Sequence, residues 1–183
     1  MTVRVAYQGR PGAFSELAVR DFMPAAAALP CRWFDGVMEA VQSGTAELGV
    51  LPIHNSLAGV LAESCALLAR KSVAVLDELV LPISHALLAA PGTEFRQLRR
   101  VLSHPAALAQ CQGFFRRHNL KAVMAEDTAG AVETLMNERP AQTAAVAGVH
   151  VAELYGATVL AEQIEDSRDN RTTFLLFGTS RIE

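Results

Sequence analysis

The sequence predicts an α/β fold, because short apolar segments of strand length alternate with amphipathic segments of helix length. Residues 48–53 form an apolar run, as strands buried in parallel sheets tend to do. Residues 14–22 instead place Phe14, Leu17 and Ala18 three or four positions apart, which is the spacing of a helix with one buried face. With 183 residues, 51% of them hydrophobic, the chain can build one compact domain or two small lobes.

The first half of the chain predicts three strands and three helices. Gly44 ends the second helix, since glycine readily takes the left-handed conformation that closes a helix. The expected strands are residues 3–7, 31–34 and 48–53, and the expected helices are residues 14–22, 37–42 and 57–70.

The second half repeats this alternation. Pro105 suits the first turn of a helix that Ser103 or His104 caps, and Asp127 or Thr128 caps the next helix. We therefore expect parallel sheets covered by helices, within a single domain of residues 1–183. One lobe would hold about residues 1–80 and about 160–183, and the other about residues 81–159. The expected strands are residues 83–89, 123–125, 143–147, 158–164 and 173–177, with helices beginning near residues 105, 128 and 149.

Bulk properties exclude several classes of protein. The net charge is −3 with basic residues scattered, so nothing indicates a nucleic-acid surface or an anionic membrane surface. The N-terminus has no signal-peptide pattern, and no apolar run approaches the ~20 residues that span a bilayer. Cys31, Cys65 and Cys111 are odd in number and lack paired spacing, which argues against disulfides or a zinc site. We expect a cytoplasmic protein without a metal site.

The most informative segment lies near the C-terminus, where polar residues 165–170 run directly into an apolar strand. Thr172 stands at the mouth of that strand. In a water-poor site, its hydroxyl could donate a hydrogen bond to a ligand. Without this flanking segment, a threonine that merely starts a strand would be the simpler interpretation.

Residues 170–174 resemble the Asn-x-Thr-Arg-Phe signature of prephenate dehydratases. Further blocks are similar to that family in the same order, at residues 5–16, 49–56, 83–88, 103–111, 127–132 and 152–166. The resemblance implies a two-lobed fold of the periplasmic-binding-protein type II, with the active site in the cleft between the lobes. It also implies that Thr172 is catalytic, and we expect Asn55 and Ser56 to act with it.

The other matched blocks place polar groups at strand ends and helix starts, where α/β proteins gather ligand contacts. Gly9 and Gly12 could bring backbone N–H groups to an anion, or could form only a tight turn. Asp127 and Ser103 could bind substrate or only cap helices, whereas His85 is typical of a core histidine. The expected substrate-binding residues are Gly9, Gly12, Ala13, His54, Ser103, His104, Asp127, Thr128, Ala129, Gly130, Asn170, Arg171, Thr173 and Phe174.

Two positions depart from the family pattern. His54 stands where the family has glutamate, and Thr173 stands where it has arginine. If both family residues share one site, losing both leaves its formal charge unchanged while the histidine is neutral, whereas losing one would leave a charge uncompensated. We hypothesise that His54 and Arg171 meet the substrate charge instead.

The resemblance implies a cofactor-free prephenate dehydratase that converts prephenate to phenylpyruvate. An arogenate-using relative, a prephenate decarboxylase that does not aromatise its product, and a non-catalytic small-anion binding protein remain alternatives. We expect a homodimer that binds a small-molecule substrate and neither nucleic acid nor membrane. The chain ends at Glu183 without the ACT segment common in this family, so we expect no feedback by phenylalanine through it.

Overall fold

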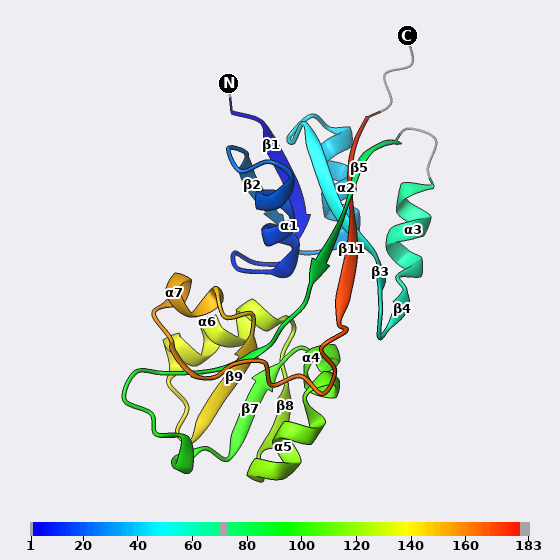
Figure 1. The fold of residues 1–183 in the computed structure, drawn as a ribbon. Helices are drawn as coiled ribbons and strands as arrows, with labels where there is room; N and C mark the ends of the chain where they lie inside the picture. Colours follow the sequence, from blue (N-terminus) through cyan, green and yellow to red (C-terminus); the bar gives the residue numbers. More distant parts are fainter. Residues whose placement is uncertain (1, 70–72, 180–183) are drawn as a thin grey trace. The chain divides into compact units, whose positions relative to one another are not determined.

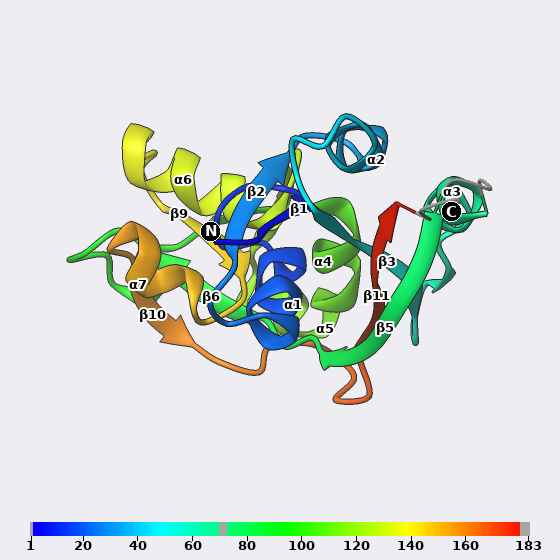
Figure 2. The same ribbon diagram turned by 90° about the horizontal axis from the view of Figure 1, so that it is seen from above.

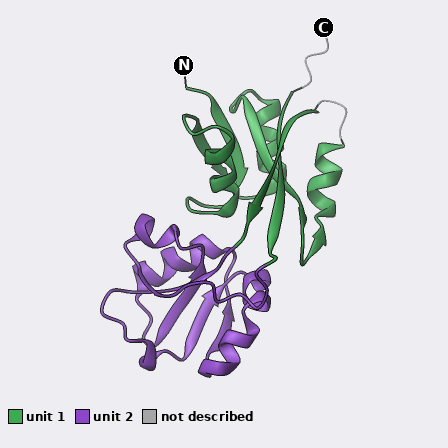
Figure 3. Ribbon diagram, viewed as in Figure 1, with its two compact units in different colours: residues 1–83, 169–183 green, residues 84–168 purple. Residues whose placement is uncertain are grey.

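The computed structural model describes residues 2–69 and 73–179. The chain forms two compact units, of which unit 1 holds residues 1–83 and 169–183 and unit 2 holds residues 84–168 (Figure 3). The chain thus returns to unit 1 at residue 169, and the expected return near residue 160 is wrong. The reason is that β10 (Thr158–Ala161) pairs with β6 (Ala86–Ala89), which belongs to unit 2.

Unit 1 is built on a mixed sheet with the strand order β2-β1-β3-β11-β5, and β4 pairs with β3 (Figure 1). β1 runs parallel to β2 and β3, whereas β11 runs antiparallel to both of its neighbours, β3 and β5. The strands are β1 Arg4–Gln8, β2 Ala27–Cys31, β3 Leu48–Asn55, β4 Gly59–Val60, β5 Val73–Pro82 and β11 Arg171–Thr179.

Helices cover both faces of this sheet (Figure 2). α1 (Phe14–Phe22) packs Ala18 and Val19 against one face. α2 (Phe34–Gln42) and α3 (Ala62–Leu68) pack against the other face, where Phe177 is fully buried. Side chains alternate between the faces of a strand, so β1, β3 and β11 each supply both cores.

Unit 2 contains a second mixed sheet with the order β10-β6-β9-β7-β8. β7 is parallel to β8 and β9, whereas β6 is antiparallel to β9 and β10. One core gathers residues of α4 and α5, and the other gathers residues of α6 and α7. The further elements are η1 Phe95–Gln97, β7 Arg100–Ser103, α4 Pro105–Gln110, α5 Gln112–His118, β8 Lys121–Met124, α6 Thr128–Glu138, β9 Thr143–Ala147 and α7 Val151–Tyr155.

Several predicted elements differ from the structure. Both sheets are mixed instead of purely parallel. The ten-residue strand β5 has no counterpart in the sequence analysis, because it lies at the sheet edge and is mostly exposed, with Asp77 and Glu78 at its centre. The helix expected over residues 57–70 is confined to α3, and its last residue lies outside the described part. In the described part of the chain, we find no helix long and apolar enough to cross a membrane.

Candidate active site

Two strand ends of unit 1 meet at one end of its sheet. β11 runs antiparallel to β3, so the carboxyl end of β3 lies beside the start of β11. Thr172 of β11 pairs directly with Asn55 of β3. Asn170, two residues earlier, is 1% exposed, and Thr172 is 8% exposed. The sheet therefore brings Asn55 next to Asn170 and Thr172, which lie more than 100 positions later in the sequence.

The orientation of the Asn55 amide is fixed by its hydrogen bonds. Its Oδ1 accepts bonds from the backbone N–H groups of Leu57, at 3.0 Å, and of Ala58, at 2.9 Å. Only the oxygen of an amide can accept such bonds, so Nδ2 must point the other way. There it donates to Asn170 Oδ1 at 2.8 Å, Thr172 Oγ1 at 3.0 Å and the Arg171 carbonyl at 3.2 Å.

This arrangement sets the role of the Thr172 hydroxyl. A hydroxyl has one proton to donate and two lone pairs to accept with. Since Thr172 Oγ1 accepts from Asn55, its proton can be directed to a ligand oxygen. The site therefore presents a preorganised donor, the kind of group that stabilises charge developing on a leaving oxygen.

Ser56 organises the segment that leads into β11. Its hydroxyl donates to the Asp169 carbonyl at 2.6 Å and accepts from the Arg171 backbone N–H at 2.9 Å. The Ser56 backbone N–H also donates to the Arg171 carbonyl at 2.9 Å. These contacts fix the backbone that carries Thr172, and the expected catalytic role of Ser56 stays a prediction.

The glycine loop after β1 uses its N–H groups within the protein. Gly9 donates to the Cys31 carbonyl at 2.9 Å, and Ala13 donates to the Arg10 carbonyl at 3.0 Å. The Gly12 N–H donates to the buried carboxylate of Glu16 at 2.6 Å. An internal carboxylate thus occupies a donor that a substrate anion was expected to use, and the sequence analysis had not assigned a role to Glu16.

Glycine is required at position 9 for a steric reason. Its φ is +119°, and an added Cβ would lie 2.8 Å from the Ala13 Cβ. The loop is therefore a tight strand-to-helix turn, which was the simpler of the two interpretations drawn from the sequence.

The two departures from the family pattern are cross-strand neighbours. His54 pairs with Thr173, one position along from the Asn55–Thr172 pair. Because side chains alternate along a strand, His54 and Thr173 lie on the opposite face of the sheet from Thr172. Arg171 shares the side of Thr173 by the same alternation. This geometry does not support the hypothesis that His54 and Arg171 meet substrate charge beside Thr172.

The joint replacement of the family's glutamate by His54 and of its arginine by Thr173 has a simpler explanation. Because these two positions pair across the strands, the chain would have lost one surface ion pair. We expect the His54→Glu/Thr173→Arg double variant to change the free energy of unfolding by no more than about 1 kcal/mol, as exposed cross-strand ion pairs do. Its kcat should match that of the parent, because the pair faces away from Thr172. Urea unfolding and steady-state kinetics of the two single variants and the double variant would check this. A large gain in kcat for the double variant would restore the charge hypothesis.

Two of the expected substrate-binding residues lie in hydrophobic cores. Phe174 is 2% exposed and packs in the core beside α1, and Ala129 is fully buried in unit 2. Their side chains contribute packing in this structure. In the sequence, they share their motif blocks with the polar residues of the expected site.

Unit 2 places the remaining predicted residues at the ends of β7 and β8. The buried Ser103 hydroxyl donates to the Val146 carbonyl at 2.7 Å. His104 caps α4, its Nδ1 accepting from the Ala106 N–H at 3.2 Å, and Asp127 caps α6 by accepting from the Gly130 N–H at 2.6 Å. The capping interpretation is confirmed for His104 and Asp127, with Thr128 as the first residue of α6, whereas Ser103 does not cap a helix.

His104 and Asp127 also interact electrostatically. The His104 side chain reaches the surface, but partial burial of its ring lowers its pKa below the ordinary value. The Asp127 carboxylate raises that pKa, by a smaller amount. The Asp127 carboxylate is therefore close enough to the His104 ring to favour its protonated form.

His85 lies in the core of unit 2, as the sequence analysis predicted. It is 3% exposed, and its Nε2 is 2.8 Å from Gln110 Oε1. Burial lowers the pKa of His85, while the bond to Gln110 and the charge of Glu165 raise it. The Glu165 carboxylate also accepts from the Ser84 hydroxyl and the His85 N–H, a role that the sequence did not reveal.

The lowered pKa of His85 predicts a pH-dependent stability. The unfolded chain takes up a proton at the ordinary pKa of about 6.5, whereas the folded chain takes it up only at lower pH. The free energy of unfolding should therefore be fully retained above about pH 6.5 and fall as the pH drops toward the folded-state pKa. Urea unfolding between about pH 8 and pH 5, the range in which histidine titrates, would measure this slope.

The matched variant is His85→Gln, which removes the titrating group. Its slope should be smaller than that of the parent, although not zero, because the lowered pKa of His104 acts with the same sign. An unchanged slope would contradict the assignment to His85.

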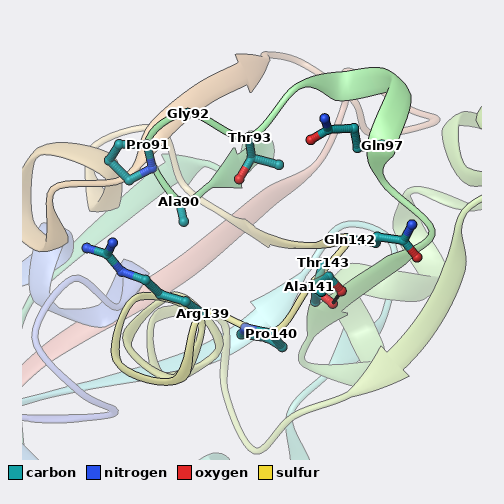
Figure 4. A pocket seen from close by; sticks show the side chains of 10 residues that line it. All are labelled: Ala90, Pro91, Gly92, Thr93, Gln97, Arg139, Pro140, Ala141, Gln142 and Thr143. Carbon is teal, nitrogen blue, oxygen red and sulfur yellow. Dashed lines mark hydrogen bonds between the residues drawn. The ribbon is translucent and has the colours of Figure 1, made fainter.

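A pocket with a volume of about 490 Å³ lies at the opposite end of the unit 2 strands from Ser103 and Asp127 (Figure 4). It is lined by residues around the end of β6 and the starts of β7 and β9, and none of the predicted site residues is among them. Arg139 is its one cationic lining residue. The lining residues are Ala90, Pro91, Gly92, Thr93, Gln97, Arg139, Pro140, Ala141, Gln142 and Thr143.

The fold and the cluster around Thr172 define an α/β protein with a candidate site of buried polar residues at strand ends. Within residues 2–69 and 73–179, no three histidine, cysteine or acidic side chains gather in a way that could hold a metal ion. The family model for prephenate dehydratase matches residues 5–181, and the chain belongs to the prephenate dehydratase family.

Similar proteins include arogenate dehydratase 1 of Petunia hybrida, 42% identical over 183 residues, which cover 99% of this chain and 43% of that protein. The bifunctional N-acyl-homoserine lactone acylase/prephenate dehydratase of Komagataeibacter europaeus is 38% identical over 172 residues, covering 94% of this chain and 61% of that protein. The solved structure of prephenate dehydratase from Arthrobacter aurescens in complex with L-Phe has a TM-score of 0.88 and 31% identity, covering 97% of this chain and 60% of that one. The predicted fold class is thus confirmed, and this chain spans less than two thirds of the length of each of these relatives.

Proposed function

We propose that the chain catalyses the decarboxylating dehydration of prephenate to phenylpyruvate. The observation that carries this proposal is the Thr172 hydroxyl, which the Asn55 amide holds as a hydrogen-bond donor at 3.0 Å. Family membership supports the reaction class, and the donor geometry supports the step that the class requires.

The proposed reaction breaks two bonds that join the substrate ring to its substituents, one to a carboxylate and one to a hydroxyl group. The electron pair of the bond to the ring carboxylate moves into the ring and carbon dioxide departs. The ring hydroxyl leaves at the same time and takes up one proton, so that it is released as water. The ring becomes aromatic, and Thr172 donates its hydrogen bond to the departing oxygen, where negative charge develops.

Arogenate is the second candidate substrate. The 42% identity to a relative named arogenate dehydratase favours it. Arogenate carries an amino group where prephenate carries a keto oxygen, and the leaving hydroxyl is the same. The contact of Thr172 would therefore serve either substrate.

The test is incubation of the purified chain with each substrate in turn. Phenylpyruvate from prephenate supports the proposal, and phenylalanine from arogenate alone would move the assignment to the second candidate. Carbon dioxide release without an aromatic product would indicate the decarboxylase, and binding without turnover would indicate the non-catalytic protein. The cytoplasmic location, the homodimer and the position of the active site in the cleft between the lobes stay predictions.

A further inference from the structure

Asn170 contacts Asn55, the residue that orients Thr172. Asn170 is among the least exposed polar residues of unit 1, with 1% of its surface exposed. Its backbone carbonyl accepts from the Ile83 N–H at 2.9 Å, and its Oδ1 accepts from Asn55 Nδ2 at 2.8 Å. A buried oxygen already engaged by a protein donor is poorly placed for the substrate contact that the sequence had suggested.

The protons of the Asn55 amide are fewer than the acceptors around them. An amide nitrogen carries two protons, and three oxygens lie within reach, on Asn170, Thr172 and Arg171. The shortest of the three contacts is the one to Asn170. The Asn170 oxygen accepts one of the two protons. The backbone N–H groups of Leu57 and Ala58 hold the oxygen of the Asn55 amide, and Asn170 holds its nitrogen, so the plane of the amide is fixed at both ends.

We infer that Asn170 is a positioning residue for Thr172, acting through Asn55. With Asn170 Oδ1 in place, one proton of the Asn55 amide is committed, and the amide plane presents the other to Thr172 Oγ1. Without it, a buried N–H group lacks its acceptor, and the amide tilts to recover a bond. The Thr172 hydroxyl then loses its fixed direction. This inference rests on the proposed function, since it concerns the same catalytic threonine.

The inference requires a specific kinetic pattern. Asn170→Ala should lower kcat about tenfold to thirtyfold, as expected when one hydrogen bond of ordinary strength is lost at the transition state. KM should change little, because Asn170 does not touch the substrate. Asn170→Asp, which keeps an acceptor oxygen in the same place, should recover most of the loss.

A double-variant cycle separates positioning from a general structural role. In the Asn55→Ala background, Asn170→Ala should have almost no further effect on kcat, because the residue through which it acts is already missing. Additive losses in this cycle would overturn the inference. So would an Asn170→Ala variant that turns over like the parent. Urea unfolding of each variant identifies any loss that comes from unfolding alone.

A measurement on the resting protein keeps the inference separate from the proposed function. In nitrogen-15 NMR spectra, the two Asn55 side-chain amide protons of the parent should exchange slowly with solvent. One should lose this protection in Asn170→Ala and keep it in Asn170→Asp, whereas equal protection in all three proteins would refute the inference. If the parent turns over neither prephenate nor arogenate, the proposed function fails, and the NMR result still decides the role of Asn170.

Discussion

Replacing Thr172 with valine should lower kcat by about 10²–10³, the usual cost of removing one preorganised donor from an active site. KM should change much less, because the hydrogen bond strengthens as the carbon–oxygen bond breaks and contributes little to ground-state binding. Valine has nearly the same shape as threonine and suits the same strand position, so the variant tests the hydroxyl itself. Steady-state kinetics with prephenate and with arogenate would measure the effect.

Two further variants control this experiment. Thr172→Ser keeps the hydroxyl and should retain measurable activity. Thr158→Val makes the same substitution at the exposed first residue of β10 in unit 2, and it should turn over like the parent. If Thr172→Val also turned over like the parent, Thr172 would not be the catalytic donor.

Replacing Asn55 with aspartate should lower kcat by a comparable factor, on the order of 10² or more. The substitution keeps the shape of the side chain but replaces the Nδ2 donor with a second oxygen. That oxygen would accept the Thr172 proton, which reverses the hydroxyl and turns it away from the leaving group. The two backbone bonds from Leu57 and Ala58 could still form, since the aspartate retains their acceptor.

Asn55→Ala provides the comparison for this prediction. It removes the orienting bond without offering a competing acceptor, so Thr172 can still donate in a fraction of its rotamers. We expect its kcat to lie between those of the parent and Asn55→Asp. An Asn55→Asp variant more active than Asn55→Ala would contradict the proposed direction of the Thr172 hydroxyl.

Much of this site could be predicted from the sequence because its parts are local patterns. Asn170 and Thr172 stand together at the start of one strand, and Asn55 follows the buried β3 directly. Even the bond between Gly12 and Glu16 spans only four residues, so a helix-start pattern could have indicated it. Periodicity gave the helices α1 and α2 and the apolar strands β1, β3 and β9 nearly where they lie.

The pairing of strands could not be predicted in the same way. β5 has a polar centre and a mostly exposed surface, so its pattern does not show that β11 will pair with it along its length. The mixed character of both sheets also depends on which strands meet, and the local pattern of a strand does not fix the direction of its neighbour.

The sequence by itself determined the α/β class, the family and the threonine at the mouth of a strand, because each is written in consecutive residues. Only the tertiary structure decided that Asn55 orients Thr172, that Asn170 stands behind Asn55, and that His54 faces away with Thr173. The physical reason is register. Residues separated by more than 100 positions become neighbours through the alignment of β3 with β11, and a shift of one residue would turn every side chain of a strand to the other face.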